Sequence, residues 1–475
     1  MDNLDYCEFT SKPKSMLIAP AGHGKTHTIA ECMKHVSGKQ LILTHTHAGV
    51  SSIKAKLKKA GIASEKFNVE TISSFAQKYA LAFYSGQDLP SPDSGHVYYT
   101  FLISKAEEYL KLKPIAEILS TTYSGLFVDE YQDCTIAQHN LISVVAETLK
   151  THILGDYLQG IFGFNGESLV DLQNHDSIGE FYYHQYKIET PWRWKGTNEP
   201  LGIALKQIRK KLEESTEINL EDFESIETHI VEENDLYSST KTYFQEISSL
   251  LRNDNILIIH NDSANKHSRL KFVKIFNNSP RLIESMDDPD FYKLSEKLEV
   301  TSEVSILSTI NSICCELFNK SEVKKWIKEQ CLVRKATETD RKLIQPIAAN
   351  IEQLKKKISL NILADTFIKI SKLPSIKCYR KELFRSLIKS MELAECHGIN
   401  VQEAMINQRN IIRRAGRNIK GRCIGTTLLT KGLEFDTVAI LNAHKFRCPK
   451  HLYVAMTRAS RRLIIFTKTP KLNPY

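Results

Sequence analysis

Residues 16–36 read MLIAPAGHGKTHTIAECMKHV, and this stretch decides the fold of the first part of the chain. A short apolar run leads into a turn that contains two glycines, and a helical pattern follows up to Val36. The turn fits the P-loop pattern G-x-x-x-x-G-K-[ST], except that Ala19 stands at the first glycine position. A tight turn without bulky side chains lets backbone N–H groups approach phosphate oxygens. The stretch therefore predicts a phosphate site at the start of an α/β domain.

The residues of this loop have separate expected roles. Lys25 would reach the β- and γ-phosphates of a nucleotide, and the Thr26 hydroxyl would hold Mg²⁺. The remaining residues expected to contact the nucleotide are Ala21, Gly22, His23 and Gly24. The alternative is an ordinary glycine turn at the start of a helix. The strand before the turn and the helix after it favour the phosphate site.

A second block, LFVDEYQD at residues 126–133, places two carboxylates at the end of an apolar strand. Asp129 at the strand end is suited to hold Mg²⁺, and Glu130 is suited to orient or deprotonate an attacking water. Such a pair alone is common, but it follows the P-loop by about 100 residues within one α/β pattern. The two blocks together predict a site for ATP and Mg²⁺.

Short apolar runs divide the chain into two α/β regions. Continuous apolar runs are typical of buried parallel strands. They occur at 16–18, 41–43, 126–128 and 152–154, and again at 256–259, 437–441 and 463–466. We therefore predict a first core at 1–75 plus 121–180 with a small helical insertion at 76–120, and a second core at 181–275 plus 422–475 with a helical insertion at 276–421.

Composition limits the classes of partner. The chain has 475 residues and a formal net charge of +9, which permits a polyanionic partner. Its 10 cysteines form no CxxC pair. No run approaches the ~18 apolar residues of a membrane span, and the first 16 residues do not resemble a secretory signal. We expect a cytoplasmic protein with free thiols and no membrane partner.

Six blocks, in order, resemble the UvrD/Rep/PcrA group of superfamily 1 helicases. They are APAGHGKT at 19–26, DEYQD at 129–133, GDYLQGIFGFNG at 155–166, PWRW at 191–194, TTLLTKGLEFD at 426–436 and YVAMTRA at 453–459. The resemblance implies an α/β fold with two RecA-like P-loop cores, and ATP in the cleft between them.

The same resemblance implies roles for single residues. Gln159 would sense the γ-phosphate, and Arg193 and Arg458 would reach that phosphate from the second core. Trp192 would stack on adenine. Glu434 would couple the DNA backbone to the nucleotide cleft, with Gly432 allowing close approach of the backbone. Trp194 we interpret as a packing residue.

The resemblance also implies a track for single-stranded DNA, because aromatic side chains stack on any base. The residues at the corresponding positions are Thr44, His45, Thr71, Ser74, Phe75, Phe162 and Phe164. Phe75 and Phe162 are equally compatible with a place in the hydrophobic core. His45 stands where the family has a stacking phenylalanine, so ATP hydrolysis is better supported than processive unwinding.

Two functions are compatible with these blocks. The first is an ATP-dependent translocase or helicase moving 3′ to 5′ on single-stranded or tailed duplex DNA. The second is a DNA-activated ATPase that acts as the regulatory subunit of a nuclease-containing anti-phage defence complex, because the chain also resembles compact helicase subunits such as that of Gabija. A nucleotide-binding switch without a DNA role is a third, weaker interpretation, which an ATPase assay with and without DNA would separate from the others.

Overall fold

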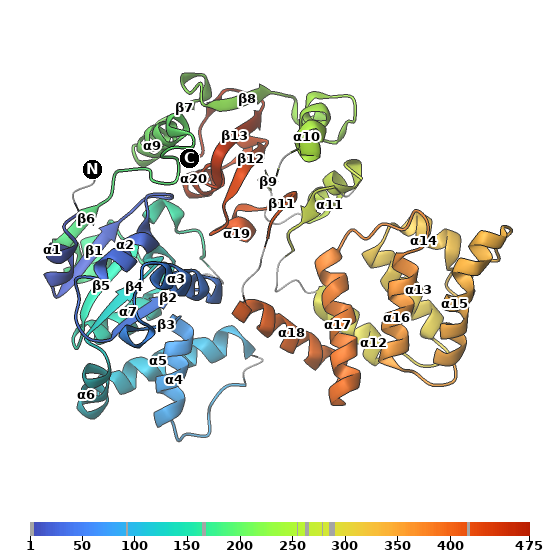
Figure 1. Ribbon diagram of the computed structural model, residues 1–475, viewed down its shortest axis with the longest axis horizontal. Coiled ribbons are helices and arrows are strands. Elements are labelled where there is room, and N and C mark those ends of the chain that lie inside the picture. Colours follow the sequence, from blue (N-terminus) through green and yellow to red (C-terminus); the bar gives the residue numbers. More distant parts are fainter. Residues whose placement is uncertain are drawn as a thin grey trace.

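A computed structural model describes residues 4–91, 94–163, 168–253, 255–261, 266–277, 279–284, 290–415 and 419–475. The chain forms two α/β cores and a lobe made of helices (Figure 1). In that view the first core lies at the left in blue and cyan, the second core lies above it in green and red, and the helical lobe lies at the right in yellow and orange. The prediction of two parallel-sheet α/β cores is confirmed.

The first core contains a six-stranded parallel sheet with the order β3-β2-β4-β5-β1-β6. Its strands are β1 (Lys14–Ile18), β2 (Gln40–Thr44), β3 (Phe67–Thr71), β4 (Gly125–Val128), β5 (Lys150–Gly155) and β6 (Gln185–Lys187). The inner strands β2 and β4 are buried along their whole length, as apolar residues on both faces of a covered sheet require. Helices therefore cover both faces.

One face packs against α1 (Tyr6–Ser11), α2 (Lys25–Cys32) and α3 (His47–Lys59). The other packs against α4 (Ile72–Phe83), α5 (His96–Leu110), α6 (Lys113–Thr122) and α7 (Ile136–Ala146). The expected insertion at 76–120 is helical, but its buried side chains belong to the same hydrophobic cluster as the sheet. These helices are therefore part of one face of the first core.

The second core contains another six-stranded parallel sheet, with the order β10-β11-β9-β12-β13-β8. Its strands are β8 (Ile226–Ile230), β9 (Ile256–His260), β10 (Arg281–Leu282), β11 (Cys423–Gly425), β12 (Phe435–Leu441) and β13 (Ala459–Thr467). Its helices are α9 (Glu199–Glu213), α10 (Thr242–Asn253), α11 (Lys266–Ile275), α19 (Thr427–Thr430) and α20 (Pro449–Met456). A small ribbon of β7 (Ile218–Asn219) and β14 (Lys471–Leu472) accompanies them.

Two sheet boundaries differ from the expected ones. β6 pairs with β1, so the first sheet extends past residue 180 to Lys187. β10 pairs with β11, so the second sheet extends past residue 275 to Leu282. Both are short strands at a sheet edge, and only their backbone pairing with β1 and β11 assigns them to a sheet.

The helical lobe has its own hydrophobic core. It consists of α12 (Asp290–Glu299), α13 (Ile306–Leu317), α14 (Lys320–Trp326), α15 (Glu338–Leu354), α16 (Leu360–Ser371) and α17 (Lys381–His397). Helix α18 (Val401–Ala415) runs from this lobe back to the first core, where it contacts α3 (Figure 1). Among the described residues, no helix combines the length and the apolar character needed to cross a bilayer.

Candidate active site

The P-loop follows β1 and turns through two glycines in the left-handed region. Gly22 has φ 75° and Gly24 has φ 91°, conformations that glycine adopts without the strain of a Cβ atom. Gly24 caps α2, so that Lys25 and Thr26 are the first residues of the helix. The N-terminus of a helix favours an anion because its first N–H groups have no partner within the helix. The geometry is that of a phosphate-binding turn.

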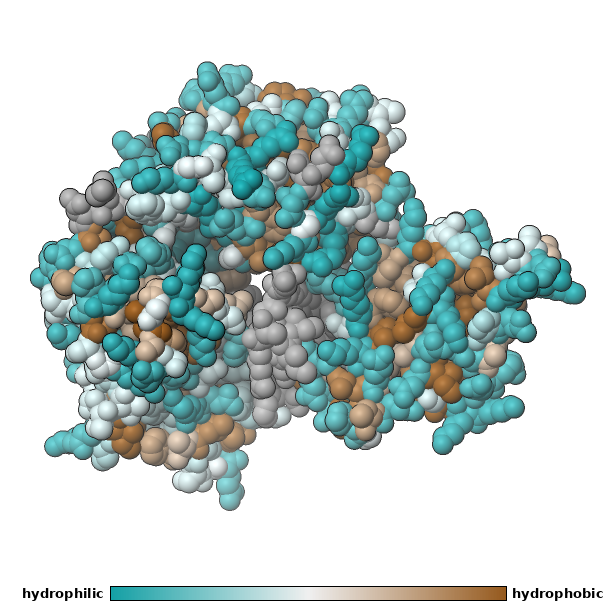
Figure 2. All heavy atoms as spheres, in the orientation of Figure 1, coloured by the Kyte–Doolittle hydropathy of each residue, from teal (hydrophilic) through white to brown (hydrophobic). Residues whose placement is uncertain are grey.

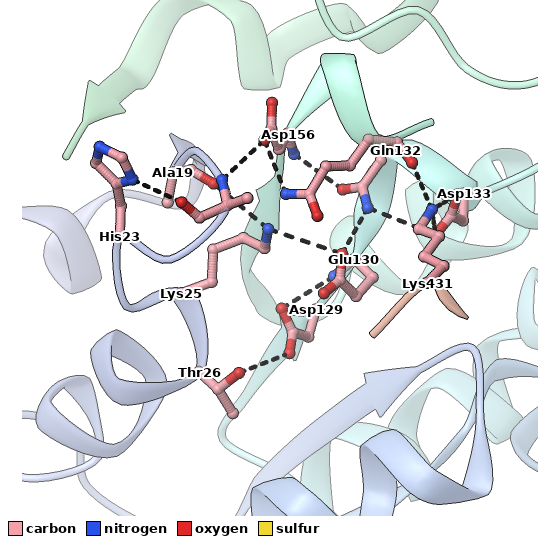
Figure 3. Close-up of polar contacts among 12 residues, drawn as sticks. Ala19, His23, Lys25, Thr26, Asp129, Glu130, Gln132, Asp133, Asp156 and Lys431 are labelled. Carbon is pink, nitrogen blue, oxygen red and sulfur yellow. Dashed lines mark hydrogen bonds and ion pairs between the residues drawn. The ribbon is translucent and has the colours of Figure 1, made fainter. Parts of the chain in front are cut away.

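The two carboxylates after β4 face this turn (Figure 3). Lys25 Nζ lies 3.7 Å from Glu130 Oε2. Thr26 Oγ1 donates a hydrogen bond to Asp129 Oδ2 at 3.4 Å. Glu130 has φ 58°, an unusual value for a residue with a side chain, and its carboxylate accepts a hydrogen bond from Gln132 at 2.5 Å. The bend at Glu130 thus places both carboxylates beside the P-loop.

The pKa values of the neighbouring carboxyl groups of Asp129 and Glu130 are shifted in opposite directions. The pKa of Asp129 is raised to about 6 by burial and by the charge of Glu130. Burial also acts to raise the pKa of Glu130, but the positive charges of Lys25 and Lys431 outweigh it and lower that pKa to about 2. Glu130 is therefore ionised at neutral pH, as a residue that accepts a proton from water must be.

Oxygen atoms of Thr26 and Asp129 are the ligand types that Mg²⁺ prefers, and their proximity fits one shared ion that keeps several waters. Asp129 is only 4% exposed, and a cation beside it would favour its charged form. These two residues would hold the ion, and the family's ATP chemistry implies the same assignment. The ion would neutralise charge on the phosphate oxygens.

Arg458 reaches the site from the second core. It follows α20 directly and is 2% exposed. One guanidinium nitrogen donates to Gln159 Oε1 at 3.3 Å, and others donate to the carbonyl oxygens of Val454 and Leu433 at 3.0 and 3.1 Å. Gln159 also donates to Asp156 Oδ2 at 2.8 Å. Gln159 therefore lies between the first core and the arginine of the second.

Arg193 and Glu434 form a second link at the cleft. Their side chains pair at 2.8 Å, and the Arg193 backbone N–H donates to the carbonyl of Gly22 at 2.9 Å. Gly432 has φ 78°, and a Cβ atom there would meet nothing within 4 Å. Its left-handed conformation favours glycine, and the close approach of a DNA backbone at this residue stays a prediction.

The two tryptophans beside Arg193 differ. Trp192 is 47% exposed and borders the P-loop: its indole would lie 3.6 Å from a Cβ on Gly24, and Lys195 Nζ lies 4.5 Å from the centre of its ring. Trp194 is 1% exposed; it packs against Gly22 and donates from Nε1 to the carbonyl of Ala459 at 2.9 Å. Trp194 is the packing residue that we predicted, and it joins the P-loop to β13.

Lys431 is a site residue that the sequence did not identify. Its ammonium group contacts both Asp133 carboxylate oxygens and the carbonyl of Gln159, each at 2.5 Å (Figure 3). It also lies 4.4 Å from the centre of the Phe162 ring. Burial raises the pKa of Asp133 to about 7, against the opposing effect of the Lys431 charge. The sequence offered one signal for this role: Lys431 is the only charged residue before Glu434 in the block TTLLTKGLEFD at 426–436.

Lys56 on α3 is a further cation near the site that the sequence did not identify. Its pKa is lowered mainly by burial of part of the side chain, although the residue keeps an exposed flank. Asp129 and Glu434 favour its charged form, and Arg193 opposes it. Its charge thus acts on the same cleft. Because nothing in the helical spacing distinguishes Lys56 from its neighbours, only the fold identifies it.

The expected DNA track is only partly exposed. Phe75 is fully buried against Tyr79 in the core, which corrects its assignment to a stacking surface. Thr44 and Thr71 are also buried, and the Thr71 hydroxyl caps α4 by accepting from the Ser74 N–H. Phe164 lies outside the described residues.

His45 and Phe162 are half-buried and lie near the cleft. His45 Nε2 is 3.5 Å from the Cys134 sulfur, and its pKa is lowered to about 4 by burial and by the Lys431 charge. Both residues therefore border Lys431, which links the strand ends of the first core to the second core. Whether they contact DNA stays a prediction.

Comparison with known proteins agrees with this geometry. A family model described as the UvrD/REP helicase N-terminal domain matches residues 92–177, a segment that contains Asp129, Glu130 and Gln159. A comparison with curated protein sequences found no match. Together with the two parallel-sheet cores, this match supports a UvrD-like superfamily 1 helicase.

Proposed function

We propose that this chain is an ATP-driven motor that moves 3′ to 5′ along single-stranded DNA. The observation that supports it best is that one site receives groups from both cores. Lys25 and Asp129 lie on the P-loop side, and Arg458 enters from the second core through its contact with Gln159. A site divided in this way closes or opens when the cores move, which is what conversion of hydrolysis into movement needs.

The chemistry follows from the charges at the cleft. Lys25 would bind the phosphates, and the ionised Glu130 would take a proton from the attacking water. Arg458 would stabilise the charge that develops on the γ-phosphoryl oxygens. Arg193 is held by Glu434 beside the P-loop carbonyl of Gly22, where it is suited to the same task. Trp192, which is 47% exposed beside the P-loop, would stack on the base.

DNA is the partner that the family domain favours, in single-stranded or tailed duplex form. The carboxyl ends of parallel strands share one sheet edge, and the segments after β2 and β3 carry His45 and Ser74 there. Lys431 connects this edge to the nucleotide site through Asp133 and Gln159. We propose that strand binding and hydrolysis are coupled through this lysine.

Lys25→Ala tests the proposal directly. The variant should lose ATP turnover by at least about a hundredfold, because the cation that binds the phosphates is gone. It should keep its circular dichroism spectrum, since the contacts of Lys25 Nζ with the Ala19 carbonyl at 3.4 Å and with Glu130 at 3.7 Å are both long. His27→Ala is the matched control on the same helix, because its side chain is 66% exposed. Turnover near the wild-type rate in Lys25→Ala would refute the motor.

A second function has independent support: a DNA-activated ATPase subunit that acts beside a separate nuclease in anti-phage defence. The 76–120 insertion carries exposed apolar side chains, among them Leu81, Phe83, Val97, Leu112 and Ile118. Apolar surface is visible at the lower left of Figure 2, where the helices of this insertion lie in Figure 1, and exposed apolar patches often mark protein contacts. Strand displacement on tailed duplexes by the chain alone supports the motor; ATPase without displacement supports the subunit.

A further inference from the structure

We propose that Arg209 on α9 is a positioning residue that holds the P-loop and Gln159 in register with the second core. The inference rests on the proposed ATP hydrolysis and adds a specific buried contact to it. Arg209 is 7% exposed and lies on the apolar face of α9, one turn after Leu205. Nothing in the motif blocks includes it. A cation on a buried helix face is costly unless its charge is compensated.

Asp156 compensates that charge. Arg209 Nη1 donates to Asp156 Oδ1 at 2.7 Å, and Asp156 is fully buried in the segment after β5. The other oxygen, Oδ2, accepts from the Ala21 backbone N–H at 3.1 Å and from Gln159 Nε2 at 2.8 Å. One carboxylate therefore fixes a P-loop amide, the γ-phosphate-sensing glutamine and an arginine of the second core.

The rest of the guanidinium is held by the second core and by aromatic rings. Nη1 also donates to the Tyr453 hydroxyl at 3.1 Å, and Nε pairs with Glu213 at 2.7 Å. The rings of Tyr157 and Tyr453 lie 4.9 and 5.2 Å from its central carbon. Tyr453 belongs to α20, the helix that leads directly into Arg458. A planar group with several fixed donors can make these contacts together, whereas a lysine cannot.

A chain of contacts follows from this geometry. It runs from the Ala21 amide through Asp156 and Arg209 to Tyr453 on α20, while Gln159 connects Asp156 to Arg458. A shift of α20 therefore moves the carboxylate that fixes the P-loop. Loss of Arg209 would leave nucleotide binding largely intact, because Lys25 remains in place. It would misplace Gln159 and Arg458 during hydrolysis.

The test uses the full chain with Arg209→Lys, Arg209→Met and Tyr453→Phe. Lys210→Met is the control, since Lys210 is on the same helix and its side chain is 76% exposed. For each we would measure kcat and KM for ATP with and without single-stranded DNA, the dissociation constant of a fluorescent ADP analogue, and Tm. We expect kcat with DNA to fall roughly tenfold in Arg209→Lys and several-fold in Tyr453→Phe, with less than about threefold change in ADP affinity.

The outcomes separate positioning from general stability. The inference is supported if, well below Tm, kcat falls while ADP affinity holds, and if the losses in Arg209→Lys and Tyr453→Phe do not add in the double variant. It is overturned if both single variants keep wild-type kcat, or if only Tm changes. Should Arg209→Met fail to fold, Arg209→Lys and Tyr453→Phe decide. A wild-type chain without ATPase activity would instead refute the proposed function.

Discussion

Trp192 and Trp194 are two residues apart, yet a large part of one indole is exposed and the other is buried. Trp194→Ala would open a cavity between Gly22 and β13 and leave the Ala459 carbonyl without its donor. We expect it to lower the free energy of unfolding by about 3–5 kcal/mol. Trp192→Ala removes an exposed ring and should change that free energy by less than about 0.5 kcal/mol. Urea titration of both variants measures the difference.

Nucleotide affinity should depend on Trp192, whereas stability should depend on Trp194. If Trp192 stacks on the base, Trp192→Ala weakens binding of an ATP analogue by about 1 kcal/mol or more, as loss of a base stack does. Equal affinity in Trp192→Ala and wild type would remove this tryptophan from the nucleotide site. Equal stability of Trp194→Ala and wild type would contradict its role as the link between P-loop and β13.

Lys431 and Asp133 form an ion pair between the two cores, and variants of both residues test whether this pair stabilises the protein. Their side chains are 6% and 3% exposed, so Lys431→Met would leave a buried carboxylate without its partner. We expect a loss of about 3–5 kcal/mol in stability, with much of it recovered in the double variant Lys431→Met/Asp133→Asn. Thermal unfolding measures stability and a double-mutant cycle measures the coupling. Additive losses would mean that the pair is not coupled.

At the scale of elements, β5 carries a buried histidine that makes the first core sensitive to acid. His152 is 2% exposed between the rings of Phe9 and Phe127, and burial lowers its pKa to about 3. The unfolded chain binds a proton below pH ~6.5, where the folded chain does not. Stability present above that pH should be lost as the pH falls toward 3, by up to about 1.4 kcal/mol for each pH unit.

His152→Phe should remove this part of the pH dependence. The ring keeps its aromatic neighbours, and the Ser15 hydroxyl that faces His152 can still donate to the Phe9 carbonyl at 3.2 Å. Urea midpoints measured at pH 5 and pH 7.5 should therefore differ less in the variant than in wild type. His27→Phe, at an exposed histidine of α2, should leave the difference unchanged. A parallel pH profile in His152→Phe would show that other groups control it.

The same elements explain how much of the fold could be predicted. Strands buried on both faces, such as β2 and β12, have continuous apolar sequences and were found from those sequences alone. Edge strands such as β8, with the sequence IETHI, are half exposed and lack that signal. β6 and β10 span only three and two residues, so they are identified mainly by their hydrogen bonds to a neighbouring strand.

The site divides in the same way. Lys25 and Asp129 were predicted because each belongs to a short local pattern, the P-loop turn for Lys25 and the end of an apolar strand for Asp129. Lys431 lies 298 positions from Asp133, and Arg209 lies 53 positions from Asp156, so neither pair has a local pattern. The position of Phe75 in its helix is compatible with a core residue and with an exposed residue that stacks on a base. Only packing against Tyr79 distinguishes the two.

In the molecule as a whole, the most buried carboxylate contact described between the helical lobe and the second core is that of Glu284. Glu284, two residues after β10, accepts from Arg380 Nε at 2.6 Å and from the Leu383 backbone N–H at 3.2 Å. The latter lies in the first turn of α17, where a negative charge is favoured. Glu284 and Arg380 are 2% and 4% exposed. We therefore expect this contact to help set the direction of α17 relative to the β10 edge of the sheet.

Glu284→Gln should loosen the lobe without unfolding it, because the lobe has a separate hydrophobic core. Arg380 would lose its buried ion pair with Glu284, at a cost of up to about 3–5 kcal/mol concentrated at this junction. Hydrogen exchange should accelerate in the first turn of α17 and stay slow in α16. Glu382→Gln is the control, since its pair with Arg281 is longer, at 3.8 Å, and partly exposed. Equal acceleration across the whole lobe would mean that Glu284 supports the lobe's folding, and unchanged exchange in α17 would mean that other contacts orient it.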